Sequence, residues 1–183
     1  ASIISAANTC DSTYVDTDGG SRKLHTCNGV TNPDTSTLEN VRGMMTTCRG
    51  RLVYSARGYS LIVDKARAST FAFTPDNIVG AWSISLPGKR TMRNKVVGAW
   101  VNPGDLYKED LYPAESAAFR ALDNGVMLES RIELPFTQNT HEAQMLCERE
   151  LRQSRIGIQV SFRAFMSALK CEVGDVVTIT HPT

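Results

Sequence analysis

The 183-residue sequence lacks two features that define common protein classes: an excess of charge and long hydrophobic runs. Twenty Lys and Arg residues are balanced by nineteen Asp and Glu residues, which leaves a formal net charge of +1. A protein that binds nucleic acid usually carries a basic surplus. Apolar stretches are interrupted well before the roughly 18 to 20 residues that a membrane-spanning helix needs. We therefore expect no sequence-specific nucleic acid partner and no membrane span.

Signature motifs of common enzymes and cofactor sites are also missing. GxGxxG, GxxxxGK[ST] and GxSxG patterns do not occur, so a phosphate-binding loop and a hydrolase nucleophile elbow are not expected. His141 and Glu142 begin like the HExxH zinc-protease motif, but position 145 is Met. From these absences we expect no enzymatic activity and no cofactor.

The five cysteines show no CxxC pair and no short Cys/His spacing of the structural-zinc type; they are Cys10, Cys27, Cys48, Cys147 and Cys171. An odd number of scattered thiols favours reduced, unpaired cysteines. Cys48 and Cys147 lie on the apolar stripes of two predicted helices, where a thiol behaves as a small hydrophobe. We expect these two thiols to be buried, and we expect no metal site.

The composition is that of a folded globular protein, with 42% hydrophobic and 21% charged residues. The length fits one large domain or two small ones that share a core. The sequence begins without Met, carries no secretory signal and ends on TITHPT, where a strand is predicted. We interpret it as a piece of a longer polypeptide.

Two segments have helical periodicity. Ser36 and Glu39 match a capping box, so the sequence predicts a helix over 37–49, with Gly50 as its C-terminal cap. A second helix is predicted over 140–153, after Asn139 as N-cap. Its apolar stripe consists of Ala143, Leu146, Cys147 and Leu151.

Strand patterns surround these two helices. A hairpin is predicted at 51–55 and 59–63, and further strands at 22–27, 94–101, 126–134, 156–162 and 176–180. The 66–88 segment suggests short extended pieces. The chain shows no repeated βαβ pattern. We therefore predict an α+β fold with mainly antiparallel strands, divided into a helix-hairpin subdomain over 1–88 and a strand-rich subdomain with one long helix over 89–183.

Several residue groups have both a chemical and a structural interpretation. His25 and Cys27 share one face of a predicted strand, as a thiolate–imidazole pair requires. If these two residues instead bound a metal, Cys10 is a possible third ligand. Glu142, Glu148 and Glu150 offer carboxylates for acid–base chemistry, but their alternation with arginines favours a solvated helix face.

Two longer segments have more than one possible role. The run 88–95 carries four cations, which suit phosphates, an acidic partner chain or solvent only. The connection over 102–125 is longer than the usual loop, so it is functional, a partner contact or partly helical around 115–122.

Three sequence blocks together resemble a known family. The first is LENV at 38–41 with RLVYS at 51–55; the second is RTMRNKVVGAW at 90–100; the third combines ELPF at 133–136, AQMLCERELRQSR at 143–155 and VGDVVTITH at 173–181. Over residues 8 to 181 these blocks resemble, in order and residue pattern, the central tail-tip protein of long-tailed bacteriophages. This is the host-specificity protein (protein J) of lambda-like phages. The first 35 residues and the 102–125 connection carry no motif of that family.

The resemblance implies a hub-like α+β segment, with a β-barrel-like part, inside a longer chain that assembles as a trimer at the tail end. The implied role is structural: tail assembly, host attachment and DNA delivery, in a phage or a prophage. Implied partners are other tail-tip and tail-tube proteins and, through the full-length protein, a host cell-surface receptor. The implied location is the virion tail tip, with the bacterial cytoplasm during assembly.

Three alternatives remain. A hub of a contractile tail or of a tail-derived secretion system would share the same strands. A small intracellular thiol-dependent enzyme would use Cys27 with His25. A receptor-binding module would use the 102–125 connection to contact a cell-surface ligand.

Overall fold

The structure is a computed structural model, and it describes residues 3–16, 18–55, 58–86, 88 and 90–180. The chain divides into two compact units, one made of Ala1–Asp64 with Lys89–Ile156 and the other of Lys65–Gly88 with Gly157–Thr183. One boundary of this division follows Gly88, where the sequence places its single boundary, and two more follow Asp64 and Ile156. The reason is a long-range strand pairing, which joins the segment before Gly88 to the C-terminal segment rather than to the N-terminal helix and hairpin.

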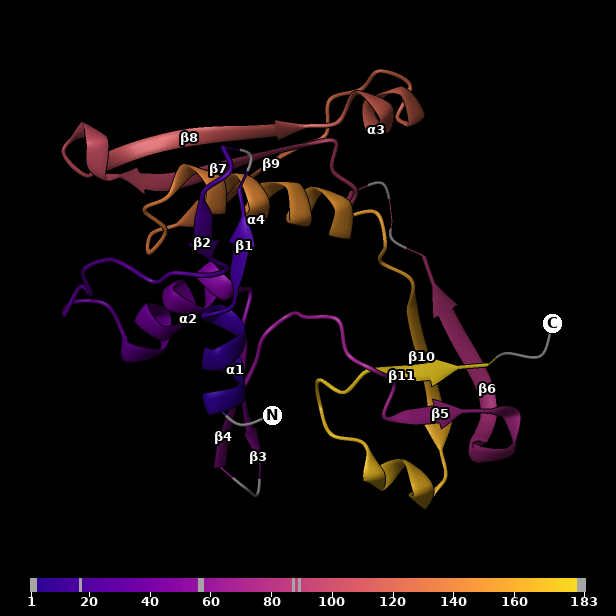
Figure 1. Ribbon diagram of the computed structural model, residues 1–183. Helices are drawn as coiled ribbons and strands as arrows, with labels where there is room; N and C mark the ends of the chain where they lie inside the picture. Colours follow the sequence, from indigo (N-terminus) through magenta and orange to yellow (C-terminus); the bar gives the residue numbers. More distant parts are fainter. Residues whose placement is uncertain (1–2, 17, 56–57, 87, 89, 181–183) are drawn as a thin grey trace. The chain divides into compact units, whose positions relative to one another are not determined.

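The first unit contains a three-stranded sheet in the order β8-β7-β9. The strands are β7 (Lys95–Asn102), β8 (Lys108–Glu115) and β9 (Glu129–Leu134), and β7 pairs antiparallel with β8 and parallel with β9. The short elements η2 (Pro103–Asp105) and α3 (Ala117–Leu122) connect them. Helix α4 (Thr140–Gln153) lies along one face of this sheet (Figure 1).

The core of this unit lies between α4 and the sheet. Two clusters of buried side chains fill it, and they consist of Val96, Ala114, Cys147 and Leu151 in one and Trp100, Leu134, Ala143 and Leu146 in the other. All four residues of the predicted helix stripe are among them, so the predicted bounds and the buried face of this helix are confirmed. At Gly98 in β7 an added Cβ would lie 2.4 Å from Cys147 Sγ, so only glycine lets the helix approach this closely.

The same unit also contains the N-terminal elements. These are α1 (Ile3–Cys10), the hairpin β1 (Thr13–Val15) with β2 (Ser21–Lys23), α2 (Thr37–Cys48), and the hairpin β3 (Arg51–Ser55) with β4 (Gly58–Ile62). Ala6, Cys48 and Val63 form their small buried cluster. The thiols of Cys48 and Cys147 are both buried, as the sequence predicts.

The second unit consists of two strand pairs and two short 3-10 helices. β5 (Phe71–Phe73) pairs parallel with β11 (Val177–Ile179), and β6 (Ile78–Ser85) pairs antiparallel with β10 (Gln159–Ala164). The 3-10 helices are η1 (Pro75–Asn77) and η3 (Met166–Lys170). Phe162 packs against Phe73, with ring centroids 5.0 Å apart, and against Trp82.

The predicted α+β class with mainly antiparallel strands is confirmed. The described strands form sheets of two or three strands and no closed barrel. Among the described residues there is no helix of the length and apolarity that a membrane crossing requires. Helix α1 is not among the predicted elements. Helix α3 agrees with the option of a partly helical stretch around 115–122.

Three local expectations need correction. The predicted strand over 22–27 is limited to Ser21–Lys23, because the chain then leaves the hairpin and its next backbone N–H groups bond to residues 10 and 12. The 102–125 connection is mostly regular structure, because β8 pairs along the whole of β7. The C-terminal cap of α2 is Arg49, in the left-handed conformation with φ 50°, rather than Gly50.

Candidate interaction groove

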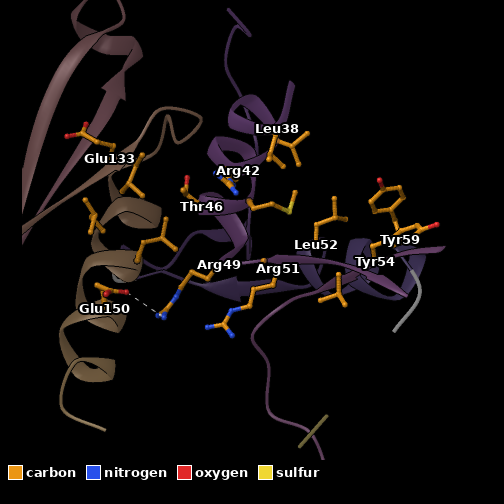
Figure 2. Close-up of a pocket in the computed structure, with 17 residues that line it drawn as sticks. Leu38, Arg42, Thr46, Arg49, Arg51, Leu52, Tyr54, Tyr59, Glu133 and Glu150 are labelled. Carbon is orange, nitrogen blue, oxygen red and sulfur yellow. Dashed lines mark ion pairs between the residues drawn. The ribbon is translucent and has the colours of Figure 1, made fainter. Parts of the chain in front are cut away.

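Four elements of the first unit surround an open cavity of about 730 Å³, which we call the α2–β9 groove. Its walls come from α2, the β3–β4 hairpin, β9 and α4 (Figure 2). The capping box of Ser36 and Glu39 fixes the start of α2. At its other end, Gly50 allows the tight passage into β3, because an added Cβ would lie 2.8 Å from Cys48 Sγ.

The surface of the groove is largely apolar. Leu134 of β9 and Leu146 of α4 lie buried at its inner side. Leu38 of α2 and the hairpin residues Leu52, Tyr54 and Tyr59 also line it, and all four are exposed. The Tyr54 and Tyr59 rings contact each other across the hairpin in a tilted arrangement, with centroids 4.9 Å apart. Exposed apolar side chains that are grouped together in this way are typical of binding surfaces.

Five charged side chains line the groove, and the arginines outnumber the carboxylates. Arg49 lies 3.7 Å from Glu150 (Figure 2), and Glu133 accepts a hydrogen bond at 2.7 Å from Arg131, which lies outside the groove. Arg42 and Arg51 have no carboxylate at ion-pair distance within the part of the chain that the structure describes. Burial lowers the pKa of Arg49. The groove is thus apolar with an excess of positive charge.

His25 and Cys27, the alternative thiolate–imidazole pair, do not make the contact that a cysteine nucleophile requires. The His25 ring is buried, its Nδ1 lies 3.8 Å from Glu142 Oε1, and neither ring nitrogen has a hydrogen-bond partner among the described residues. Cys27 is exposed, and its thiol interacts with the Thr47 side chain. Partial desolvation of the sulfur raises the pKa of Cys27, which is opposite to the shift that activates a thiol.

The proposed third metal ligand, Cys10, lies next to Cys48. Burial raises the pKa of the Cys10 thiol to about 11. Three other side chains do approach one another: ligand atoms of Asp16, Asp18 and His141 lie within 4.8 Å. This is the group of potential metal ligands that the described residues bring together.

The carboxylate of Asp16 in that group is already occupied. It accepts hydrogen bonds from the backbone N–H groups of Asp18 and Gly20, at 3.1 and 2.6 Å, and from the Arg22 side chain. The Arg22 hydrogen bond lowers the pKa of Asp16. This carboxylate therefore has the contacts of a structural group, which tie the β1–β2 turn together.

The expectation of a solvated face for Glu142, Glu148 and Glu150 is wrong for one of them. Glu142 is buried, and it accepts hydrogen bonds from the backbone N–H and the hydroxyl of Thr26, at 2.9 and 2.7 Å. Glu148 and Glu150 remain partly exposed. The sequence gives no sign of this contact, because its two partners are 116 residues apart.

The cationic run over 88–95 is partly used within the chain. Lys95 forms an ion pair with Glu129 at 2.8 Å, and Arg93 donates to the carbonyl oxygens of Arg90 and Met92. Lys89 lies outside the described residues.

The sequence does not predict the α2–β9 groove, because its walls come from four separate segments and no single segment carries a motif for it.

Comparison with known proteins gives the family. The family model described as "Putative phage tail protein" matches residues 36–183. A relative is the baseplate hub protein pb3 of Escherichia phage T5, 22% identical over 162 residues, which are 87% of this chain and 17% of that protein. The chain therefore spans about a sixth of the length of this relative.

A solved structure, the virion of a native gene transfer agent particle, contains a chain with the same fold. Its TM-score is 0.68 at 14% identity, over 84% of this chain and 35% of that one. The family match covers most of the chain, including the whole α2–β9 groove. The chain belongs to this family of phage tail proteins and is a structural component of a tail.

Proposed function

We propose that the chain is part of the central hub at a phage or prophage tail tip, of the kind found in the host-specificity proteins of lambda-like phages. In this role it acts in tail assembly, host attachment and DNA delivery, and it has no catalytic activity of its own. The family match and the hub protein among its relatives support a tail component.

The observation that carries the proposal is the α2–β9 groove. A tail subunit must bind neighbouring subunits, and such contacts need grouped apolar side chains with a polar surround. Leu38, Leu52, Tyr54 and Tyr59 provide such a surface at one site. The most strongly shifted thiols, in contrast, have raised pKa values, which suit inert buried groups.

From this role we infer that the partners are other tail-tip and tail-tube proteins. The full-length protein forms a homotrimer that also contacts a host receptor. The location that follows is the virion tail tip, after assembly in the bacterial cytoplasm. The thiol enzyme that uses Cys27 and His25 is disfavoured by the raised pKa of Cys27. A receptor-binding loop over 102–125 is disfavoured because β8 and α3 occupy most of that segment.

To test the proposal, a stop codon is introduced into the gene and the tails in the resulting lysates are examined by electron microscopy. We expect tail assembly to stop at an early stage, without complete tails, and a plasmid copy of the gene to restore them. The substitution Cys27→Ala in that plasmid copy should restore tails as well as the unchanged gene does. Complete, infectious tails in the absence of the protein would contradict a hub role.

A further inference from the structure

The turn between β7 and β8 exposes two large apolar side chains that no described part of the chain covers. We call residues 103–107 the β7–β8 tip. Leu106 is 83% exposed and Tyr107 is 65% exposed. Figure 1 shows this turn at the far end of the β7–β8 hairpin, away from α3. Because Leu106 and Tyr107 are adjacent, they form a small apolar patch that another molecule can cover.

The backbone holds these two side chains in an unusual conformation. Leu106 and Tyr107 have φ values of 53° and 59°, in the left-handed region that bulky residues rarely adopt. Asn102 supports the turn, because its side chain accepts from the Gly104 N–H at 2.9 Å and its carbonyl from the Tyr107 N–H at 3.0 Å. Backbone strain of this kind is often retained at functional sites.

The residues around the tip are acidic. Asp105, Glu109 and Asp110 are all exposed, and Lys108 is the single cation among residues 103–110, so this segment has a formal charge of −2. Glu109 pairs with Arg131 of β9, so Asp105 and Asp110 are the carboxylates that can contact another molecule. Asp105 contacts Lys108 at 3.3 Å in an exposed pair, which contributes little. Asp110 accepts from the Asn102 side chain and has no cation partner among the described residues.

The α2–β9 groove has the complementary properties. Its surface is apolar, and Arg42 and Arg51 lack carboxylate partners within the described residues. We propose that the β7–β8 tip of one copy of the chain occupies the α2–β9 groove of a second copy. Leu106 and Tyr107 contact the apolar surface of the groove, while Asp105 and Asp110 pair with Arg42 and Arg51.

This contact joins two different surfaces, because the tip and the groove come from separate parts of the chain. Such a head-to-tail contact can repeat from copy to copy, and it closes into a ring when the rotation between copies allows it. The inference thus deepens the proposed function, on which it rests, since it names the surfaces through which hub subunits meet.

Photo-cross-linking tests the contact directly. The substitution Tyr107→p-benzoylphenylalanine places a photoreactive ring at the tip, and a mixture of ¹⁴N- and ¹⁵N-labelled protein distinguishes links between copies from links within one copy. We expect mixed-isotope cross-links to peptides from residues 38–54. Overturning results are links within one copy only, links to other regions, or links only to a different tail protein when assembled particles are irradiated.

A charge exchange provides a second test, by analytical ultracentrifugation of the purified chain. We expect Arg42→Glu with Arg51→Glu to weaken self-association about tenfold, as should Asp105→Lys with Asp110→Lys. A mixture of the two variants pairs the new charges, and it should recover association between unlike copies. Equal association in all samples, or no association of the unchanged chain, would overturn the proposal.

Leu106→Asp guards against effects of misfolding, because this residue is exposed in the single chain. It should abolish the contact while leaving the circular dichroism spectrum unchanged. Leu122→Asp is the matched control, since Leu122 is 77% exposed and lies outside both surfaces; it should leave association unchanged. The stop-codon experiment tests the hub role separately. If tails need the protein but Leu106→Asp leaves the mixed-isotope cross-links intact, the hub role stands and the proposed tip contact is contradicted.

Discussion

The buried carboxylate of Glu142, in the first turn of α4, accepts two hydrogen bonds from Thr26, one from its backbone N–H and one from its hydroxyl. This contact ties the segment after β2 to the helix that covers the sheet. Because the carboxylate is buried and accepts both bonds, it links the N-terminal segment to this helix.

We expect Glu142→Ala to lower the free energy of unfolding by about 2 to 4 kcal/mol, because the Thr26 donors would then be left without an acceptor. Thr26→Val removes only the hydroxyl bond and should cost about 1 kcal/mol. Urea denaturation followed by circular dichroism measures both values. An effect of Glu142→Ala no larger than that of Glu148→Ala, a partly exposed control on the same helix, would contradict the contact.

The close approach of α4 to β7 at Gly98 gives a second prediction. Gly98→Ala would place a Cβ 2.4 Å from Cys147 Sγ, so we expect a destabilisation of about 1 to 3 kcal/mol from overpacking. Gly98→Ala combined with Cys147→Ala should cost less than the sum of the two single changes, because the second removes the sulfur. Strict additivity in the double-mutant cycle would show that the two residues do not touch.

The apolar stripe of α4 gives a third prediction. Leu146 is 2% exposed, so Leu146→Asp buries an unpaired charge, and we expect a loss of several kcal/mol in the free energy of unfolding. Leu122→Asp, at an exposed position of α3, is the control and should change stability by less than about 0.5 kcal/mol. A comparably small effect at Leu146 would mean that the helix buries another face.

Thiol reactivity separates a structural protein from a thiol enzyme. Burial raises the pKa values of Cys10 and Cys147 to about 11, and it also raises that of Cys27. Because the thiolate is the reactive form, we expect iodoacetamide at pH 7.5 to modify no cysteine of the native protein faster than a free peptide cysteine. Rapid alkylation of Cys27 that His25→Ala abolishes would instead support an enzyme.

The β1–β2 turn gives a prediction for pH. The Arg22 hydrogen bond lowers the pKa of Asp16 below its ordinary value of 3.8, so the charged form is favoured in the folded state. Its contribution to stability is therefore complete above the ordinary pKa and is lost as the pH falls through the lowered one. We expect Asp16→Asn to be less stable than the unchanged protein at pH 7, with the difference shrinking in acid. A constant difference between pH 7 and pH 2 in urea denaturation would contradict this role.

The sequence predicts best those elements whose signals are local. The capping box at Ser36 and Glu39 marks the start of α2, and the stripe from Ala143 to Leu151 marks the buried face of α4. Helix α1 is only eight residues long and borders a stretch rich in Asn, Asp, Ser, Thr and Gly, so the sequence pattern does not indicate it. Arg49 rather than Gly50 takes the left-handed position, and Gly50 instead allows the close approach to Cys48.

Features that depend on contacts between distant segments were not predictable. Glu142 is buried in contact with Thr26, and the β6–β10 pairing joins the segment before Gly88 to the C-terminal segment. The α2–β9 groove also depends on contacts between distant segments. Its charge excess arises because Glu133 and Glu150 already have partners, whereas Arg42 and Arg51 have none among the described residues.

We propose that this chain forms part of the hub at the tail tip. A cryo-electron microscopy reconstruction of tails from the phage or prophage that encodes it tests this claim most directly. We predict density for the β8-β7-β9 sheet with α4 at the tip, repeated around the tail axis, with each β7–β8 tip in a neighbouring groove. Tails whose tip is complete without this fold, or a single copy away from the axis, would contradict the claim.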